Sequence, residues 1–179
     1  MSSGDLRGKW PDVPACYGWL SLDRRGAWLL QGERVTHPGL IAFLKAHYAI
    51  DQQGCCYVQN GPQRVFVDLA CTPWVYRWQA PTLISHVDSP AGRVNALLVD
   101  TEGNLYVEAE NGFGLLDDRD LPTVLEELRR PDGTPSTDSD LLALLNGETV
   151  VLNWQDVPVR ALQPTDLEHA FGFVKRPRV

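Results

Sequence analysis

The sequence predicts an α+β fold made of two related, mostly antiparallel β units, each a hairpin followed by a helix and a second hairpin. Three landmarks recur in one order: an Asp-x-x-Gly turn between apolar runs, a proline-led helix, and an Asn-Gly pair followed by a strand and a proline. The predicted division is an N-terminal segment at 1–16, a first unit at 17–80, a linker at 81–93, a second unit at 94–168 and a C-terminal tail at 169–179.

The first unit begins with the stretch "LSLDRRGAWLL", in which Asp23 and Gly26 mark a tight turn between two strands. A helix then starts at Pro38, since proline suits the first helical position and apolar residues follow at helical spacing. The second hairpin turns at Asn60-Gly61, a strong hairpin signal between strands.

The second unit repeats this order after the linker "APTLISHVDSPAGR", whose prolines and glycine indicate a boundary. Its turn lies at Asp100 to Gly103 and its helix follows in "LPTVLEELRR". Residues 138–147 have two interpretations: the repeat predicts a strand ending in the Asn-Gly turn, and the composition predicts a short helix. In the helical interpretation Asp138 or Ser139 is the N-cap and Gly147 ends the helix.

The composition limits the classes of protein to which this chain can belong. With 179 residues, 44% of them hydrophobic, the chain can bury a core without disulfides or metals. The net charge of −7 argues against general nucleic-acid binding. No apolar run approaches the ~20 residues of a membrane span, and no apolar signal segment opens the chain, so we expect a cytoplasmic protein with no membrane partner. The four cysteines are then expected to be buried thiols, and the basic "KRPR" at 175–178 a solvated tail.

The stretches "GWLSLDRRGAWLL", "HPGLIAFLKAHY" and "TPWVYR" together resemble a family of unknown function found mainly in proteobacteria. They also resemble a wider bacterial group of domains of unknown function, over residues 17–79 more closely than over the second half. The resemblance implies a two-domain protein with internal duplication, whose second domain has a superficial likeness to the pleckstrin-homology fold. It further implies a small, nucleotide-like ligand between the domains and a role in signalling.

The sequence holds no pattern typical of a catalytic or metal centre. Its four histidines are isolated and no Cys-x-x-Cys occurs, so we expect neither a metal nor a cofactor. The acids Asp117, Asp118 and Asp120 precede a helix, where capping is their predicted role. In "DSPAGRVN", Arg93 beside Gly92 fits either a phosphate-contacting loop or a plain linker.

An aromatic and arginine cluster surrounds Pro73, which breaks the strand ladder. Alternation beyond this proline predicts Trp74, Tyr76 and Trp78 on one face of a strand. In one interpretation the arginines bind an anionic group and a tryptophan stacks on a planar ring. In the other, the aromatic side chains pack two sheets together and the arginines cover the edges of these aromatic side chains. The predicted ligand-binding residues are Gln63, Arg64, Trp74, Tyr76, Arg77 and Trp78.

The predicted function is non-enzymatic binding of a small anionic or planar ligand in a cleft between the two duplicated units. Duplicated halves create a crevice, and ligand sites favour domain interfaces. Two alternatives stay open. One is an enzyme whose residues, such as His37, Asp68 or Cys71, meet only in three dimensions. The other is a homodimeric scaffold formed by pairing of sheet edges.

Overall fold

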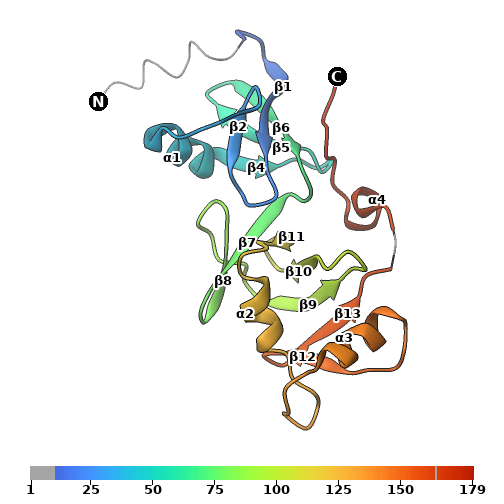
Figure 1. The fold of residues 1–179 in the computed structure, drawn as a ribbon. Helices are drawn as coiled ribbons and strands as arrows, with labels where there is room; N and C mark the ends of the chain where they lie inside the picture. The colour runs from blue at the N-terminus through green and yellow to red at the C-terminus, as the bar shows by residue number, and fades with distance from the viewer. Residues whose placement is uncertain (1–10, 164) are drawn as a thin grey trace. The chain divides into compact units, whose positions relative to one another are not determined.

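The computed structural model describes residues 11–163 and 165–179, so residues 1–10 of the predicted N-terminal segment lie outside the described residues. The chain forms two compact units (Figure 1). Unit 1 contains the described residues up to Pro73 together with Leu167–Val179, and unit 2 contains Trp74–Asp166. Both are sheets accompanied by short helices, which confirms the predicted α+β class.

Unit 1 is a six-stranded sheet in the order β3-β2-β1-β6-β5-β4. Strands β1 and β6 are parallel, and the other neighbours are antiparallel. Its elements are β1 (Ala15–Leu22), β2 (Trp28–Leu30), β3 (Glu33–Arg34), α1 (Pro38–His47), β4 (Tyr48–Ile50), β5 (Cys56–Asn60), β6 (Gln63–Leu69) and α4 (Leu167–Phe171).

The local signals of unit 1 form as predicted. The carboxylate of Asp23 accepts hydrogen bonds from the backbone N–H groups of Arg25 and Ala27, both at 2.8 Å, and Gly26 takes a φ of 78° that favours glycine. Helix α1 starts at Pro38, and His37 caps it by accepting the N–H of Leu40 at its Nδ1 atom.

Unit 2 is a seven-stranded sheet in the order β12-β13-β9-β10-β11-β7-β8. Its core centres on aliphatic residues of β9 and β10 with Trp154 and Tyr76. Its elements are β7 (Trp74–Gln79), β8 (Thr82–Ser85), β9 (Val94–Val99), β10 (Leu105–Ala109), β11 (Gly112–Leu116), α2 (Leu121–Glu126), α3 (Asp138–Leu145), β12 (Leu152–Trp154) and β13 (Val157–Ala161).

The two sheets share one topology, which confirms the predicted duplication. The order β3-β2-β1-β6-β5 in unit 1 corresponds to β11-β10-β9-β13-β12 in unit 2, and a helix lies in the same connection of each. In each sheet the third and fourth strands of this shared order are parallel: Leu20 lies opposite Val67 in the first, and Leu97 opposite Val159 in the second. Strand β4 is an addition in unit 1, and β7 and β8 are additions in unit 2.

The predicted match between Asn60-Gly61 and Asn146-Gly147, the third landmark of the repeat, is wrong. Asn146 and Gly147 end helix α3: Gly147 has a φ of 79°, and its N–H donates to the carbonyl of Leu144. The hairpin that corresponds to the second hairpin of unit 1 turns instead at Gln155 and Asp156, with φ of 48° and 66°. Asn-Gly misleads because a positive φ suits a helix end and a hairpin equally.

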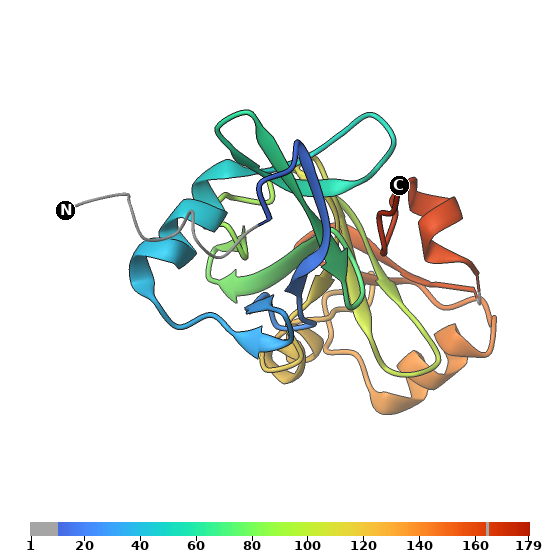
Figure 2. The same ribbon diagram turned by 90° about the horizontal axis from the view of Figure 1, so that it is seen from above.

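Residues 138–145 form helix α3, drawn in orange in Figure 2, as the composition predicted, although neither predicted N-cap is used. Thr137 is the N-cap, and its side chain accepts the N–H of Asp140 while the Asp140 carboxylate accepts the N–H of Thr137. This reciprocal pair is a capping box, which takes precedence over Asp138 and Ser139 because it satisfies two backbone donors at once.

The boundary between the units lies earlier than predicted, between Pro73 and Trp74. Strand β7 pairs in parallel with β11, and β8, within the predicted linker, pairs with β7. Gly114 on β11 permits this pairing, since a Cβ there would come within 2.6 Å of the Tyr76 ring. A pairing so distant in sequence leaves no local signal.

The C-terminal segment belongs to unit 1 and is not the solvated tail that the sequence predicted. Phe173 is buried, and the carbonyl of Lys175 accepts the N–H of Leu69 at 2.8 Å. The guanidinium of Arg178 binds both carboxylate oxygens of Asp68, at 2.8 and 3.0 Å. The segment is ordered because it completes the hydrogen bonding of β6. Among the described helices, none has the length and apolar character needed to cross a membrane.

Candidate functional site

The six predicted ligand-binding residues are divided between the units. Gln63 and Arg64 lie on β6 of unit 1, and the other four lie on β7 of unit 2. Gln63 donates its side-chain amide to the carbonyls of Pro11 and Val13, both at 2.6 Å. The guanidinium of Arg64 lies 4.4 Å from the centre of the Tyr57 ring. Both side chains thus have partners within unit 1, and their role in ligand binding stays a prediction.

On β7, Tyr76 is fully buried, and its hydroxyl donates to the carbonyl of Gly112 at 2.8 Å. Burial raises the pKa of Tyr76 to about 12. Arg77 forms a two-point ion pair with Asp120, at 2.6 Å from Nε and 3.2 Å from Nη2. These contacts support the architectural interpretation of Tyr76 and Arg77, and direct ligand contact by either one stays a prediction.

The acidic stretch before α2 serves side-chain pairing more than capping. Asp120 occupies the N-cap position but makes no side-chain cap hydrogen bond, because its carboxylate is held by Arg77 and by the N–H of Trp78 at 2.9 Å. Asp117 is fully buried and accepts from the backbone N–H and the guanidinium of Arg119. Asp120 therefore takes the predicted N-cap position without the side-chain hydrogen bond of a cap.

The Asp120 pair predicts an acid-sensitive step in unit 2. Burial raises the pKa of Asp120, but hydrogen bonds from Arg77 and the Trp78 N–H outweigh burial and hold this pKa below its ordinary value of 3.8. The carboxylate therefore stabilises unit 2 above about pH 4, and the contribution is lost as the pH falls through the lowered folded-state pKa. We expect the urea midpoint to fall more steeply in wild type than in Asp120→Asn between about pH 5 and pH 2. Equal slopes would contradict this assignment.

Unit 2 contains a hollow of about 340 Å³ between β8, the loop before β9 and the β12–β13 turn. Its wall is mainly apolar, and Arg93 is the charged residue in its lining. We call this the unit 2 hollow; it is lined by Pro81, Thr82, Leu83, Pro90, Gly92, Arg93, Val94, Trp154, Gln155 and Val157.

The backbone around Arg93 is fixed although its side chain is exposed. The Arg93 N–H donates to the Glu110 carboxylate at 3.2 Å, and its carbonyl accepts the Glu110 N–H at 2.8 Å. Gly92 has a φ of 74°, and a Cβ there would come within 2.9 Å of the same carboxylate. Within the described part of the chain, no ion pair or hydrogen bond engages the Arg93 guanidinium. This charge is available to a ligand.

Trp154 lines the unit 2 hollow, and its side chain is held in place by Glu127 and Trp78. Its indole N–H donates to one carboxylate oxygen of Glu127 at 2.8 Å, and the indole N–H of Trp78 donates to the other at 3.1 Å. The two indole rings meet edge to face, with centroids 5.0 Å apart. Trp78, a predicted ligand residue, thus supports the hollow through Trp154.

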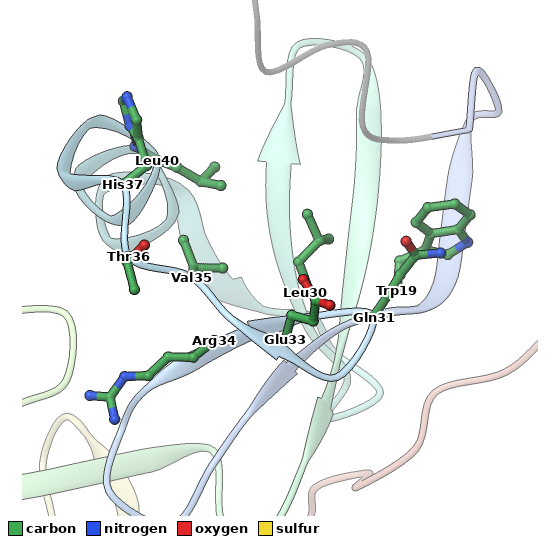
Figure 3. Close-up of a pocket in the computed structure, with 9 residues that line it drawn as sticks. All are labelled: Trp19, Leu30, Gln31, Glu33, Arg34, Val35, Thr36, His37 and Leu40. Carbon is green, nitrogen blue, oxygen red and sulfur yellow. Dashed lines mark hydrogen bonds between the residues drawn. The ribbon is translucent and has the colours of Figure 1, made fainter.

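Unit 1 contains a second hollow, of about 490 Å³, between the β2–β3 hairpin and the start of α1 (Figure 3). Apolar side chains of Leu30, Val35 and Leu40 line the middle of this hollow, and polar side chains lie around them. We call this the unit 1 hollow; it is lined by Trp19, Leu30, Gln31, Glu33, Arg34, Val35, Thr36, His37 and Leu40.

The residues named in the enzymatic alternative have separate partners in unit 1. His37 caps α1, Asp68 pairs with Arg178, and Cys71 is buried. Across residues 11–163 and 165–179, no group of three or more histidine, cysteine, aspartate and glutamate side chains is arranged to hold a metal ion. The four cysteines are free thiols, and Cys55 is partly exposed while the other three are buried, as predicted.

Sequence reasoning missed the unit 2 hollow although it noted one of its key residues. The stretch "DSPAGRVN" indicates Arg93, but Trp154 lies far along the chain from it. The pairing of β13 with β9 brings the β12–β13 turn close to Arg93. The signal available was the mixture of a glycine, an arginine and two prolines in a segment that also fits a linker.

Comparison with known proteins gives one family and two solved structures. Residues 6–178 match the model of a family described as "Protein of unknown function (DUF2946)". A DUF1285 family protein from Silicibacter pomeroyi DSS-3 is similar in structure, with a TM-score of 0.54 at 14% identity, over 89% of this chain and 88% of that chain. A DUF1285 family protein from Shewanella baltica OS155 has a TM-score of 0.44 at 14% identity, over 59% of this chain and 88% of that one. No curated protein matches the chain. The first likeness concerns the fold alone, and it agrees with the two-unit architecture.

Proposed function

Because the chain belongs to the family described as "Protein of unknown function (DUF2946)", whose description names no activity, we propose a function from the chemistry of the site. The protein binds a small anionic, planar ligand in the unit 2 hollow without changing it chemically. Nucleotide-like molecules are the first candidates, and the protein acts as a cytoplasmic sensor that passes on the ligand's presence as a signal.

The observation that carries this proposal is the Arg93 guanidinium, which no described residue pairs, at an apolar hollow. An arginine can hold a carboxylate or phosphate through two parallel hydrogen bonds. The Glu110 carboxylate, the nearby negative charge, already accepts the Arg93 N–H and so is partly compensated. An anionic group is therefore the ligand feature that this charge favours.

The remaining lining supports a flat, apolar body for the ligand. The hollow of about 340 Å³ falls in the range of ~300–1,000 Å³ typical of small-molecule sites. Leu83, Val94, Val157 and Trp154 offer apolar contacts, and Thr82 and Gln155 offer polar groups for orientation. The Glu127 bridge holds Trp154 in place before any ligand arrives, which lowers the entropic cost of binding.

The thiols support binding over covalent catalysis. A catalytic cysteine needs a lowered pKa, since the thiolate is the nucleophile. Burial instead raises the pKa of Cys56 to about 12, and burial also raises the pKa of Cys16. In Cys55, burial and then the charge of Asp51 raise the pKa. Each of these three groups is held in its unreactive, protonated form.

The covered edges of the unit 2 sheet support a binding protein over a scaffold built by pairing at those edges. The outer side of β8 faces residues 89–91, since Ser85 donates to the carbonyl of Ser89 and Ala91 donates to that of Leu83. The outer side of β12 exchanges two hydrogen bonds between Asn153 and Arg129, at 2.8 and 2.9 Å. Edges occupied in this way offer few free groups to a second chain.

The test is a thermal-shift and calorimetric screen with nucleoside monophosphates, the matching nucleosides and aromatic carboxylates. A ligand at 100 times its Kd stabilises the folded state by about 2.7 kcal/mol, which raises the melting temperature by several degrees. We expect the anionic members to stabilise the protein more than the neutral ones.

Arg93→Gln is expected to weaken binding of the anionic members about tenfold or more, because a charged hydrogen-bonded contact is worth about 1.5–3 kcal/mol. The matched control is Arg160→Gln, which removes another exposed arginine of unit 2 that does not line the hollow. If nucleosides and nucleotides bind equally, or if both arginine variants weaken binding to the same degree, the proposal fails.

A further inference from the structure

We infer that the unit 1 hollow is a second binding site, which takes a small organic cation: an ammonium group on an alkyl or aryl body. It is independent of the site proposed in unit 2, because it is built from other residues and has the opposite charge preference. The Glu33 carboxylate and the apolar and aromatic side chains around it favour such a ligand.

The β2–β3 hairpin fixes which side chains face the unit 1 hollow. Gln31 and Gly32 form a two-residue turn with φ of 50° and 82°, and the Gln31 N–H donates to the carbonyl of Trp19 at 2.7 Å. In the resulting register Leu30 lies opposite Glu33, so both project from the same face of the sheet. In Figure 3 the two side chains point in the same direction, toward the space bordered by Leu40.

Glu33 gives the unit 1 hollow its negative charge. Its carboxylate is exposed, and no residue in the described ranges forms an ion pair with it. Arg34, the next residue, lies opposite Leu29 on the other face of the hairpin, and in Figure 3 its guanidinium points away from Leu30 and Glu33. Nδ1 of His37 is occupied by the Leu40 N–H. The charge that a ligand meets beside the apolar centre is therefore that of Glu33.

The wall around Glu33 suits an ammonium ion that carries an apolar body. Leu30, Val35 and Leu40 offer aliphatic contacts, and the Trp19 indole borders the hollow on the side of the hairpin turn (Figure 3). Indole is the strongest of the aromatic side chains in attracting cations to its face. A carboxylate, an indole and an aliphatic centre together favour a cation over a neutral or anionic molecule of the same shape.

The inference can be tested with three probes of nearly equal size: 2-phenylethylamine, which is a cation at neutral pH, neutral 2-phenylethanol and anionic 3-phenylpropionate. Each is titrated into the full chain, and the backbone amide resonances of Leu30 and Glu33 are followed by NMR. We expect the amine to shift these resonances with the lowest Kd of the three. Glu33→Gln should weaken amine binding about two- to fivefold, the range for an exposed ion pair. The matched control is Asp12→Asn, which removes another exposed carboxylate of unit 1 that does not line this hollow and should leave amine binding unchanged.

Charge reversal gives a second, independent readout. Glu33→Lys should reverse the order, so that 3-phenylpropionate binds this hollow better than the amine. The inference is overturned if the alcohol binds as tightly as the amine, if Glu33→Gln and Asp12→Asn weaken binding equally, or if no probe shifts the unit 1 resonances. Shifts near Arg93 with 3-phenylpropionate would concern the unit 2 hollow, so failure of one site is distinguishable from failure of the other.

Discussion

A chain that ends at Asp166 is expected to lose the cooperative fold of unit 1 while unit 2 stays folded. The deletion removes buried Phe173, a loss worth about 3–5 kcal/mol by analogy with Phe→Ala changes in protein cores. It also leaves the N–H of Leu69, on a strand at the centre of the sheet, without the Lys175 carbonyl. Together these losses approach the whole stability of about 5–15 kcal/mol that a small domain has.

Amide-resolved NMR separates the two units in this experiment. The truncated chain should lose the dispersed resonances of β1 and β6 and keep those of β9 and β10. The control is a chain without Val179 alone, whose side chain is exposed, and its spectrum should match the wild type. A truncated chain that retains the wild-type resonances of β6 would contradict the role given to this segment.

The second large effect is expected for Glu127→Leu, which should destabilise unit 2 by about 3 kcal/mol and weaken ligand binding at the unit 2 hollow. Glu127 accepts the indole N–H groups of both Trp78 and Trp154. A hydrogen bond to a charged group contributes about 1.5–3 kcal/mol, and both indole donors would lose their partner at once. Trp154 would then lose the orientation that makes it a wall of the hollow.

Glu126→Leu provides the matched control, since Glu126 is the exposed neighbour at the end of the same helix. Urea unfolding followed by tryptophan fluorescence gives the stability of each variant, and calorimetry with the best anionic ligand gives the affinity. If Glu127→Leu unfolds at the same urea concentration as Glu126→Leu, the bridge contributes nothing measurable. If stability falls and affinity does not, Trp154 is no part of the binding site.

Much of the fold could be predicted because its signals are local. The Asp-x-x-Gly turns at Asp23 and Asp100 form in the structure with the predicted roles, since the aspartate side chain binds the turn's own backbone. Helix α1 begins at its predicted proline, which is also a local signal, because the fixed φ of proline suits the first helical position. The repetition of such local signals was enough to reveal the duplication.

The errors arose where distant residues decide the structure. Nothing near Trp74 indicates that β7 pairs with β11, because the space that admits it comes from Gly114. The basic C-terminal residues gave no sign of burial, because the buried group is Phe173 just before them. The error at Asn146-Gly147 had a local cause instead, because this pair ends a helix that a capping box at Thr137 begins.

The location of the unit 2 hollow could not be predicted from the sequence, because its lining comes from segments far apart along the chain. Arg93 lies in the predicted linker and Trp154 on β12, and neither is among the ligand-binding residues that the sequence predicted. The residues named from the dense segment around Pro73 have partners of their own: Arg77 binds Asp120, and Trp78 braces Trp154. Ligand contact by the predicted residues of this segment stays a prediction.

The composition of unit 1 from two separate stretches of chain has a consequence for the order of folding during synthesis. Residues 167–179 are translated after all of unit 2, so β6 emerges from the ribosome well before the segment that satisfies the Leu69 N–H. Unit 2 is continuous and can fold as soon as β13 has emerged. Nascent unit 1 must meanwhile wait with an incomplete sheet, which makes it the part of the molecule that chaperones and proteases would meet first.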